Sequence, residues 1–348
     1  MTGDTSISRR KRPGYVLQLN SKLRIAAMSL ALKVSSIGYW KKLKHLTTDP
    51  RFYQIGVLTA LLVYGLIQLD FGVTPLQILL ILTTALSTQL FCTRAWKRPC
   101  YDPRSALISG LSLCLLMRTD SLWLAVVSTV TAILSKFVLR VGTKHLFNPT
   151  NFGLVCMVGL TDGVWVSPGQ WGNDAIFAFF MACVGGLVVH RALRSDVSLA
   201  FLGFYTALLF SRSLWLGEPL SIPLHRVHNG ALLLFSFFMI SDPRTTPNSR
   251  AGRMLFAMIV ALGVGTIQFV LFQSNGLLWS LAVCSLAVPV IDKFLPGQEY
   301  VWSASMRFSN QASKIFNSIQ FNGGQDHEML ETVDAHTASF NSLFRRRF

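Results

Sequence analysis

The chain has 348 residues, of which 51% are hydrophobic and only 14% are charged, with a mean hydropathy of +0.45. Soluble domains carry about 25% charged residues, so this composition excludes an ordinary soluble protein and predicts an all-α protein that crosses a membrane many times. The net charge of +16 does not indicate nucleic-acid binding. Its Lys and Arg residues interleave with apolar runs, as they do in membrane proteins with basic cytoplasmic loops.

Residues 1–51 form a basic N-terminal segment without the apolar stretch and cleavage site of a secretory signal peptide. Within it, the run SKLRIAAMSLALKVSSIGYWKKLKHL alternates apolar and basic positions. This pattern predicts an interfacial helix lying on anionic membrane lipid, with a disordered tail as the alternative. Residues 296–348 turn polar and predict a C-terminal tail that is partly disordered.

Ten apolar segments lie between these ends, and they divide into two groups of five. The first group spans 52–160 and the second spans 174–295, with a turn-rich outer loop at 161–173 that holds WVSPGQWG. Three pairs of segment starts share an offset of 122 residues, and the fifth pair aligns at 127. We therefore expect two repeats of five helices, with short, broken helices at equivalent places. The segments are 52–71, 75–93, 105–117, 122–141, 147–160, 174–189, 197–210 (a brief one), 227–241, 254–272 and 277–291.

The distribution of basic residues predicts the orientation. If all ten segments cross the membrane, one set of loops holds Arg118, Arg212 and Arg226, whereas the other set is far richer in Lys and Arg. The basic side is expected to be cytoplasmic, with both termini on it, in a bacterial plasma membrane. Because each repeat has an odd number of crossings, the two repeats are expected to be inverted relative to each other.

Two stretches are candidates for a site within the membrane, KHLFNPTNFGLVCMV from Lys144 and HNGALLLFSFFMISDP from His228. Each joins a helix-breaking pair to an apolar run too short to cross a hydrocarbon core of about 30 Å. Asn148 and its neighbours can cap a helix whose free N–H groups attract an electron-rich ligand, and Asn229 and Asn275 open later segments in the same manner. Simple capping is the alternative.

Three charged residues are candidates for an ion or substrate path, namely Asp120, Asp242 and Lys136, because ionisable groups within the membrane are functional candidates. Each has a plainer alternative. Asp120 could pair with Arg118, Asp242 could begin a turn with Pro243, and Lys136 could extend to the lipid headgroups. The chain shows no nucleotide-binding loop, zinc-protease motif or cysteine pair at metal-ligand spacing, so no metal site is predicted.

The stretches SALISGLSLCLLM, KHLFNPTNFGLV, WVSPGQWG and FFMISDPRTTP resemble the family that contains RnfD, from the Rnf electron-transport complex, and NqrB, from the sodium-translocating NADH:quinone oxidoreductase. The resemblance covers residues 50–295. It implies ten helices in two inverted repeats and a role in redox-coupled movement of sodium or protons beside other subunits. The positions it implies for cofactor binding are Asn148, Pro149, Asn151, Gly153, Asp242 and Pro243.

Full members of that family carry an S-G-A-T segment whose threonine receives FMN, and this sequence has none. The resemblance therefore implies a non-covalent flavin, FMN or riboflavin, and argues against covalent FMN. It makes the chain at most an electron-transfer subunit, so whether it is an enzyme stays open. The alternative function is a stand-alone channel or facilitator for a small solute or ion, and a non-catalytic scaffold is a third.

Overall fold

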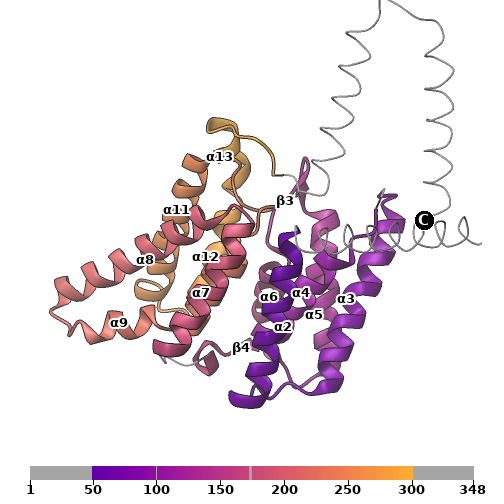
Figure 1. Ribbon diagram of the computed structural model, residues 1–348, viewed down its shortest axis with the longest axis horizontal. Coiled ribbons are helices and arrows are strands. Elements are labelled where there is room, and N and C mark those ends of the chain that lie inside the picture. Colours follow the sequence, from indigo (N-terminus) through magenta and orange to yellow (C-terminus); the bar gives the residue numbers. More distant parts are fainter. Residues whose placement is uncertain (1–48, 99, 172–174, 301–348) are drawn as a thin grey trace, which may run out of the picture. The chain divides into compact units, whose positions relative to one another are not determined.

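The computed structural model describes residues 49–98, 100–171 and 175–300, and nearly all of the two predicted terminal segments lies outside these ranges. The described chain is helical apart from two antiparallel pairs of two-residue strands (Figure 1). One pair joins β1 to β4 and the other joins β2 to β3. The strands are β1 (Met117–Arg118), β2 (Arg140–Val141), β3 (Lys144–His145) and β4 (Trp165–Val166).

The first five helices begin with proline or after a capping side chain. Proline suits the first turn because its missing N–H has no partner there, and Asp49, Thr74, Ser121 and Asn148 each accept a backbone N–H at a helix start. These local signals explain why the helices begin where they do. They are α2 (Pro50–Gln68), α3 (Pro75–Ala95), α4 (Pro103–Leu116), α5 (Leu122–Val138) and α6 (Pro149–Leu160).

The second group repeats this order with more breaks. A short 3-10 turn, η1 (Pro168–Trp171), precedes this group. Within the group, the α-helix α10 continues without a gap as the π-helix η2. The helices are α7 (Ala175–Arg191), α8 (Ser195–Leu216), α9 (Ser221–Val227), α10 (Gly230–Leu234), η2 (Phe235–Met239), α11 (Arg250–Phe269), α12 (Gly276–Ser285) and α13 (Val288–Phe294).

Two predicted segments differ from the structure. The run 197–210 was expected to be brief, but α8 has 22 residues, because the helix continues through Arg212 to a left-handed Gly217. Arg212 is tolerated there since Glu218 and the ring of Phe269 both contact it. The run 227–241 begins with the last residue of α9, and Asn229 caps α10 as predicted. The run 277–291 was expected to be one segment, but it divides into α12 and α13, which are bent by 49° relative to each other.

The two groups pack in the same pattern. In the first, α4 contacts α2 and α3, α3 contacts α5, and α5 contacts α6. In the second, α10 and η2 contact α7, η2 contacts α8, α8 contacts α11, and α11 contacts α12. Further contacts join α6 to α12 and α2 to α7. Helices α4 and α10–η2 are therefore surrounded, which is why their apolar residues are almost all buried.

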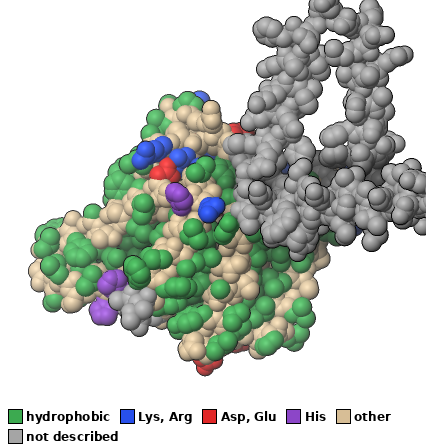
Figure 2. Space-filling model, in the orientation of Figure 1, with side chains coloured by type: hydrophobic (Ala, Val, Ile, Leu, Met, Phe, Trp, Pro, Cys, Tyr) green, Lys and Arg blue, Asp and Glu red, His purple; other side chains and the backbone are tan. Residues whose placement is uncertain are grey.

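Four helices, α2, α3, α8 and α11, are long and apolar enough to cross a membrane, and α12 with α13 would make a fifth span bent by 49°. Figure 2 shows hydrophobic side chains over most of the visible face of the described residues, with charged groups in a few small clusters. Several large side chains project from these helices, including Ile67 and Phe91 at 71% and 70% exposure. Such a surface suits lipid rather than water, so the fold is that of an all-helical membrane protein.

Candidate functional site

The first turn of α6 is the centre of the candidate site. Asn148 caps this helix, since its Oδ1 accepts the backbone N–H of Asn151 at 3.2 Å. Its Nδ2 donates to the carbonyl oxygen of Met239 at 3.3 Å and lies 3.5 Å from Oδ2 of Asp242. One buried amide thus joins the start of α6 to the end of η2, which brings two of the predicted site residues together.

Asn151 extends the site to α12. Its Nδ2 donates to the carbonyl oxygen of Leu278 at 3.0 Å, while its Oδ1 is buried and has no hydrogen-bond partner among the described residues. A buried acceptor without a partner is costly, so it marks a place where a donor from a ligand would be stabilised. The side chain is 1% exposed, so that donor would have to enter the protein interior.

Asp242 follows η2 and begins a turn, which was the alternative predicted for this residue. Its Oδ1 accepts the N–H of Arg244 at 3.0 Å, and its carbonyl oxygen accepts the N–H groups of Thr245 and Thr246. Lys136, Arg244 and Arg194 also attract its carboxylate electrostatically. A turn and a charged site are therefore both present at this residue, while Pro243 is buried beside it.

Gly153 and Pro149 have packing roles in α6. A Cβ at Gly153 would lie 2.7 Å from the Cβ of Ala132 and 3.0 Å from the carbonyl oxygen of Ser128, so glycine allows α5 and α6 to pack closely. Pro149 occupies the first turn of the helix and is buried. Neither residue offers a side-chain polar atom, so any part they play in binding is through shape.

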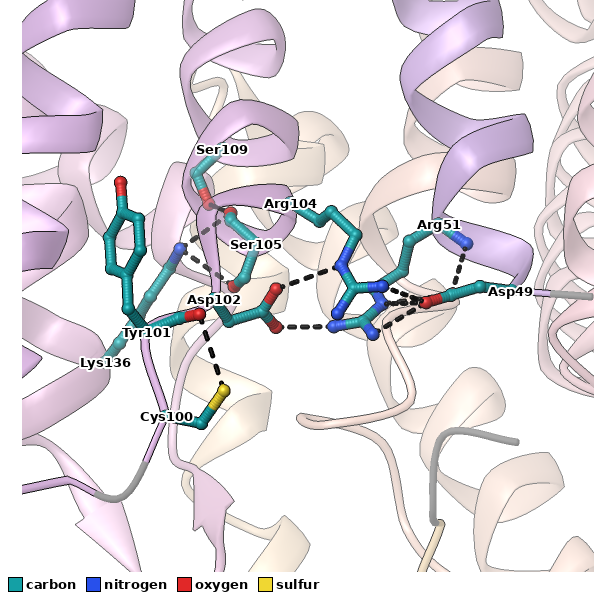
Figure 3. Close-up of polar contacts among 9 residues, drawn as sticks. All are labelled: Asp49, Arg51, Cys100, Tyr101, Asp102, Arg104, Ser105, Ser109 and Lys136. Carbon is teal, nitrogen blue, oxygen red and sulfur yellow. Dashed lines mark hydrogen bonds and ion pairs between the residues drawn. The ribbon is translucent and has the colours of Figure 1, made fainter. Parts of the chain in front are cut away.

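Lys136 does not extend to the headgroups. The side chain is 3% exposed, and its Nζ donates to the carbonyl oxygen of Ser105 at 2.9 Å and to the Ser105 hydroxyl at 3.2 Å (Figure 3). The alternative prediction was wrong because Arg140 and Lys144 lie in β2 and β3, beyond the helix end, and do not share its face. Lys136 points inward, toward α4.

A network of ion pairs lies beside this lysine at the start of α4 (Figure 3). Asp49 accepts from Arg51 at 2.7 Å and from Arg104 at 2.9 Å, and Asp102 pairs with the same two arginines. Arg51 outweighs the effect of burial, so the pKa of Asp49 lies below its usual value. The network fixes the chain before α2 to the loop before α4, and nothing in the sequence spacing indicated it.

His145 lies in β3, next to the end of α5. Its Nδ1 is buried and has no hydrogen-bond partner among the described residues. Burial lowers the pKa of the imidazole to about 3, helped by the nearby charges of Lys136, Arg140 and Arg244. The histidine is therefore neutral at physiological pH, and its Nδ1, like Oδ1 of Asn151, is a buried polar atom without a partner among the described residues.

Asp120 does not join this site. It is exposed, and no ion pair connects it to Arg118 in the described part of the chain. Arg118 instead donates to Gln170 Oε1 at 2.8 Å and lies 4.4 Å from the ring centroid of Phe71. The predicted pair failed because the β1–β4 contact turns the arginine toward η1 and the short loop before α3.

A cavity of about 190 Å³ is lined by Met239, the residue whose carbonyl oxygen accepts from Asn148. Asn229 and Asn275 both line it, as do Val166 and Pro168 from the predicted outer loop. The two asparagines differ. Asn229 caps α10 with its side chain, whereas Asn275 has a left-handed backbone with φ of 59° and makes no such cap. The full lining is Leu116, Val166, Pro168, Tyr205, Arg226, Asn229, Ala231, Leu232, Phe235, Met239, Gln268, Asn275, Gly276, Leu277 and Leu278.

This fold and site define a helical membrane protein with a buried polar centre between broken helices. Residues 157–300 match the model of the NQR2, RnfD, RnfE family. A protein of Erwinia tasmaniensis, named as the D subunit of an ion-translocating oxidoreductase complex, is 27% identical over 162 residues, which is 44% of this chain and 40% of the relative. The protein of that name from Escherichia coli O1:K1 is 30% identical over 135 residues, 38% of this chain and 36% of the relative.

These matches confirm the predicted resemblance of this chain to the RnfD and NqrB family. In them the chain spans about two fifths of the length of each curated relative. The matched family region includes Asp242, Pro243, Asn229 and Asn275 but begins after α6 starts, so Asn148 and Asn151 lie before it.

Proposed function

We propose that the chain is an integral membrane subunit of a redox-driven, ion-translocating complex. The observation that carries this is the match of residues 157–300 to the NQR2, RnfD, RnfE family, together with relatives named as subunits of an ion-translocating oxidoreductase complex. The geometry adds a buried centre where three helix ends meet around amide and carboxylate groups. Its partners would be membrane lipid and other subunits of that complex.

We also propose that residues 52–160 and 174–295 are inverted repeats, with both termini on the cytoplasmic side. The shared packing pattern of the two groups supports this. A second support is the bond from Asn151 to Leu278, because these residues are 127 apart, the offset at which the fifth segments align. A two-fold axis brings a residue close to its own counterpart only where the axis passes, so under this proposal the axis would pass near the contact between Asn151 and Leu278.

The same symmetry relates the polar site to the cavity. Asn148 donates to Met239, and their counterparts under the two offsets are Asn275 and Met117. Asn275 lines the cavity together with Leu116, the neighbour of Met117. The ion path of this proposal therefore has two related halves, with Asp242 and Lys136 in one and Asn229 and Asn275 in the other.

A non-covalent flavin fits the residues of the polar site in one respect. A flavin ring carries an imide N–H, and the unpartnered Oδ1 of Asn151 is a buried acceptor for such a donor. Asn148 and Asp242 would hold the same edge, with Pro149, Gly153 and Pro243 shaping the space. The flavin would supply electron transfer. The cavity of about 190 Å³ is smaller than the roughly 300 Å³ from which ligand pockets usually start, so we do not place a whole flavin there.

An absorbance spectrum tests the cofactor. The full chain, purified in detergent, is expected to absorb near the flavin bands, and acid precipitation is expected to release that absorbance into the supernatant. Asn151→Leu should lose it, because leucine removes the acceptor, whereas exposed Asp120→Asn should keep it. Colour retained in the pellet would mean a covalent flavin, and no colour in any preparation would count against the cofactor.

The subunit role has its own test. Complexes purified through a tag on this chain should contain other redox proteins and should move sodium or protons into vesicles when supplied with an electron donor. A chain that purifies alone from its native membrane would overturn the proposal.

The cavity favours a second candidate, a stand-alone facilitator for a small solute or ion. It is lined by Asn229, Asn275 and Arg226 among mostly apolar side chains. Solute uptake into vesicles containing only this chain, without any redox partner, would favour this candidate over the first.

A further inference from the structure

A row of polar side chains, which we call the polar seam, runs through the otherwise apolar first group of helices. Its first member is Asp102, which is 31% exposed and lies three residues before Ser105, and Lys136 donates to Ser105. The hydroxyl of Ser109 donates to the carbonyl oxygen of Ser105 at 3.1 Å, and Thr150 donates to the carbonyl oxygen of Ser109 at 3.4 Å.

The seam then meets the candidate site. Thr150 lies in the first turn of α6, next to Asn148 and Asn151, and Asn148 contacts both Asp242 and Met239. Met239 in turn lines the cavity that lies beyond it. The polar groups therefore extend from a partly exposed carboxylate to the centre of the fold, and the cavity continues from that centre.

Among the described residues, Lys136 is the only basic side chain in the part of this seam that lies between Asp102 and Asp242. Its Nζ contacts only oxygens of Ser105, and no carboxylate lies within ion-pair distance of it among those residues. Asp102 and Asp242 act on it from opposite ends at longer range. A charge placed in this way is rare in an apolar helix, because burying it without an ion pair is costly.

The groups around Lys136 come from every side that packs against α5. Asp102 lies before α4, Arg140 in β2 donates to the Lys136 carbonyl oxygen at 3.4 Å, and neutral His145 lies in β3. From the second group, Asp242 faces it electrostatically. Of the other helices that pack against α5, α3 carries the titratable side chains Cys92 and Arg94, and α6 carries Cys156.

A fixed ammonium group in a narrow, low-dielectric passage repels metal cations strongly. Protons differ, because an amine can release one and bind another. The Nζ–H bond that breaks toward Asp242 is replaced by one formed with a proton arriving from the Asp102 side. The lysine ends unchanged, and no electron moves in this step.

We propose that Lys136 makes the ion path of this chain selective for protons and closes it to sodium and potassium. The inference rests on the proposed function, since it names the ion that the path carries. Lys136 is then a specificity-determining residue, with Ser105 holding its ammonium group in the seam.

Vesicles containing the complex purified through a tag on this chain test this. With an electron donor supplied, the wild-type complex should move protons, followed by an internal pH dye, and should move no radioactive sodium. Lys136→Gln should admit sodium and lose proton flux to the level of empty vesicles. Lys136→Arg should exclude sodium but also lose proton flux, because its guanidinium does not release a proton. Lys293→Gln, at an exposed position of α13, is the matched control and should behave as wild type.

The effect of sodium on thermal unfolding tests the same inference without a measurement of ion flux. Sodium chloride, compared with choline chloride at equal ionic strength, should leave the melting temperature of the wild-type chain unchanged and should raise that of Lys136→Gln. If the glutamine variant does not fold, Lys136→Met and Ser105→Ala replace it. The methionine variant should admit sodium, and the alanine variant should still exclude it.

Sodium uptake by the wild-type chain, an absence of proton flux through it, or a folded neutral variant that still excludes sodium would each overturn the inference. None of these results bears on whether the chain purifies with redox partners. The spectrum and the tagged complex test the proposed function separately.

Discussion

At the scale of single residues, Asn148 makes two kinds of contact, one within α6 and one to η2. Asn148→Ala removes the helix cap and one of the two donors to the Met239 carbonyl oxygen, the other being the N–H of Asp242, so we expect a loss of about 2 kcal/mol in stability. Asn148→Asp keeps the cap but places a second carboxylate beside Asp242, so it should also destabilise the fold. Thermal unfolding in detergent measures both.

Asn275 is the control for this prediction. Its side chain caps nothing and its backbone is left-handed, a conformation that glycine adopts without strain. Asn275→Gly should therefore leave the melting temperature unchanged or raise it slightly. If Asn275→Gly and Asn148→Ala lowered the melting temperature by the same amount, Asn148 would act only as a residue that begins a helix.

The residues of the buried polar site around Asn148 and Asn151 could be predicted only in part from the sequence. The cap at Asn148 follows from an Asn-Pro pair before an apolar run, a local signal. The bond from Asn151 to Leu278 depends on how α6 and α12 pack, and no local pattern encodes it. Ser105 and Ser109 were missed for the same reason, because serine in an apolar helix often bonds only to its own backbone.

At the scale of helices and strands, Gly153 sets the distance between α5 and α6. Gly153→Ala forces its methyl group against Ala132 and Ser128, and overpacking of this kind costs about 1 to 3 kcal/mol. Gly56→Ala is the matched control, because a Cβ in that α2 position meets nothing within 4 Å and alanine favours helix. Thermal unfolding should show a loss for the first and none for the second. Equal effects would contradict this packing role.

A second contact between elements joins the β2–β3 hairpin to α13. Lys144 pairs with Asp292 at 2.7 Å, and Asp292 also accepts the N–H of Asn248 at 2.7 Å. Asp292→Asn removes the charge but keeps an acceptor, so it should cost about 1 kcal/mol, while Asp292→Ala should cost more because the Asn248 N–H loses its partner. Glu218→Gln, in a more exposed pair with Arg212, should change stability by under about 0.5 kcal/mol.

Hydrogen exchange locates the effect of the Asp292 variants. The hairpin amides around Lys144 should exchange faster in Asp292→Ala than in wild type, since the ion pair holds the hairpin against α13. Protection that stays unchanged in the hairpin would mean that the strands alone maintain it.

Element lengths were less predictable where charge lies inside a helix. The run 197–210 was cut short at Arg212 because an arginine normally ends an apolar segment, yet α8 continues to Leu216. The compensation comes from Glu218 and from Phe269 of another helix, so it is visible only after folding. Asn229 shows the opposite case, because the local Asn-Gly pair predicted the cap that begins α10.

At the scale of the whole molecule, the proposed inverted repeats make a topological prediction. The β2–β3 hairpin and the β4–η1 loop lie at opposite ends of the described helices, because α5 ends at the hairpin and α6 leads away from it to the loop. If α5 and α6 each cross the membrane, a residue in the hairpin faces the cytoplasm and a residue in the loop faces outward. Thr143 and Gly169 are both exposed and suit this test.

Single cysteines at these two positions, in a chain whose six native cysteines are replaced by serine or alanine, give a clear readout. In intact cells, a maleimide that cannot cross membranes should label Gly169→Cys and should label Thr143→Cys only after the membrane is permeabilised. Accessibility on the same side would mean that α6 and its neighbours form a re-entrant loop instead of complete crossings. The charge bias of the loops would then have to be explained by fewer than ten spans, and the two-fold relation that Asn151 and Leu278 mark would no longer relate the two sides of the membrane.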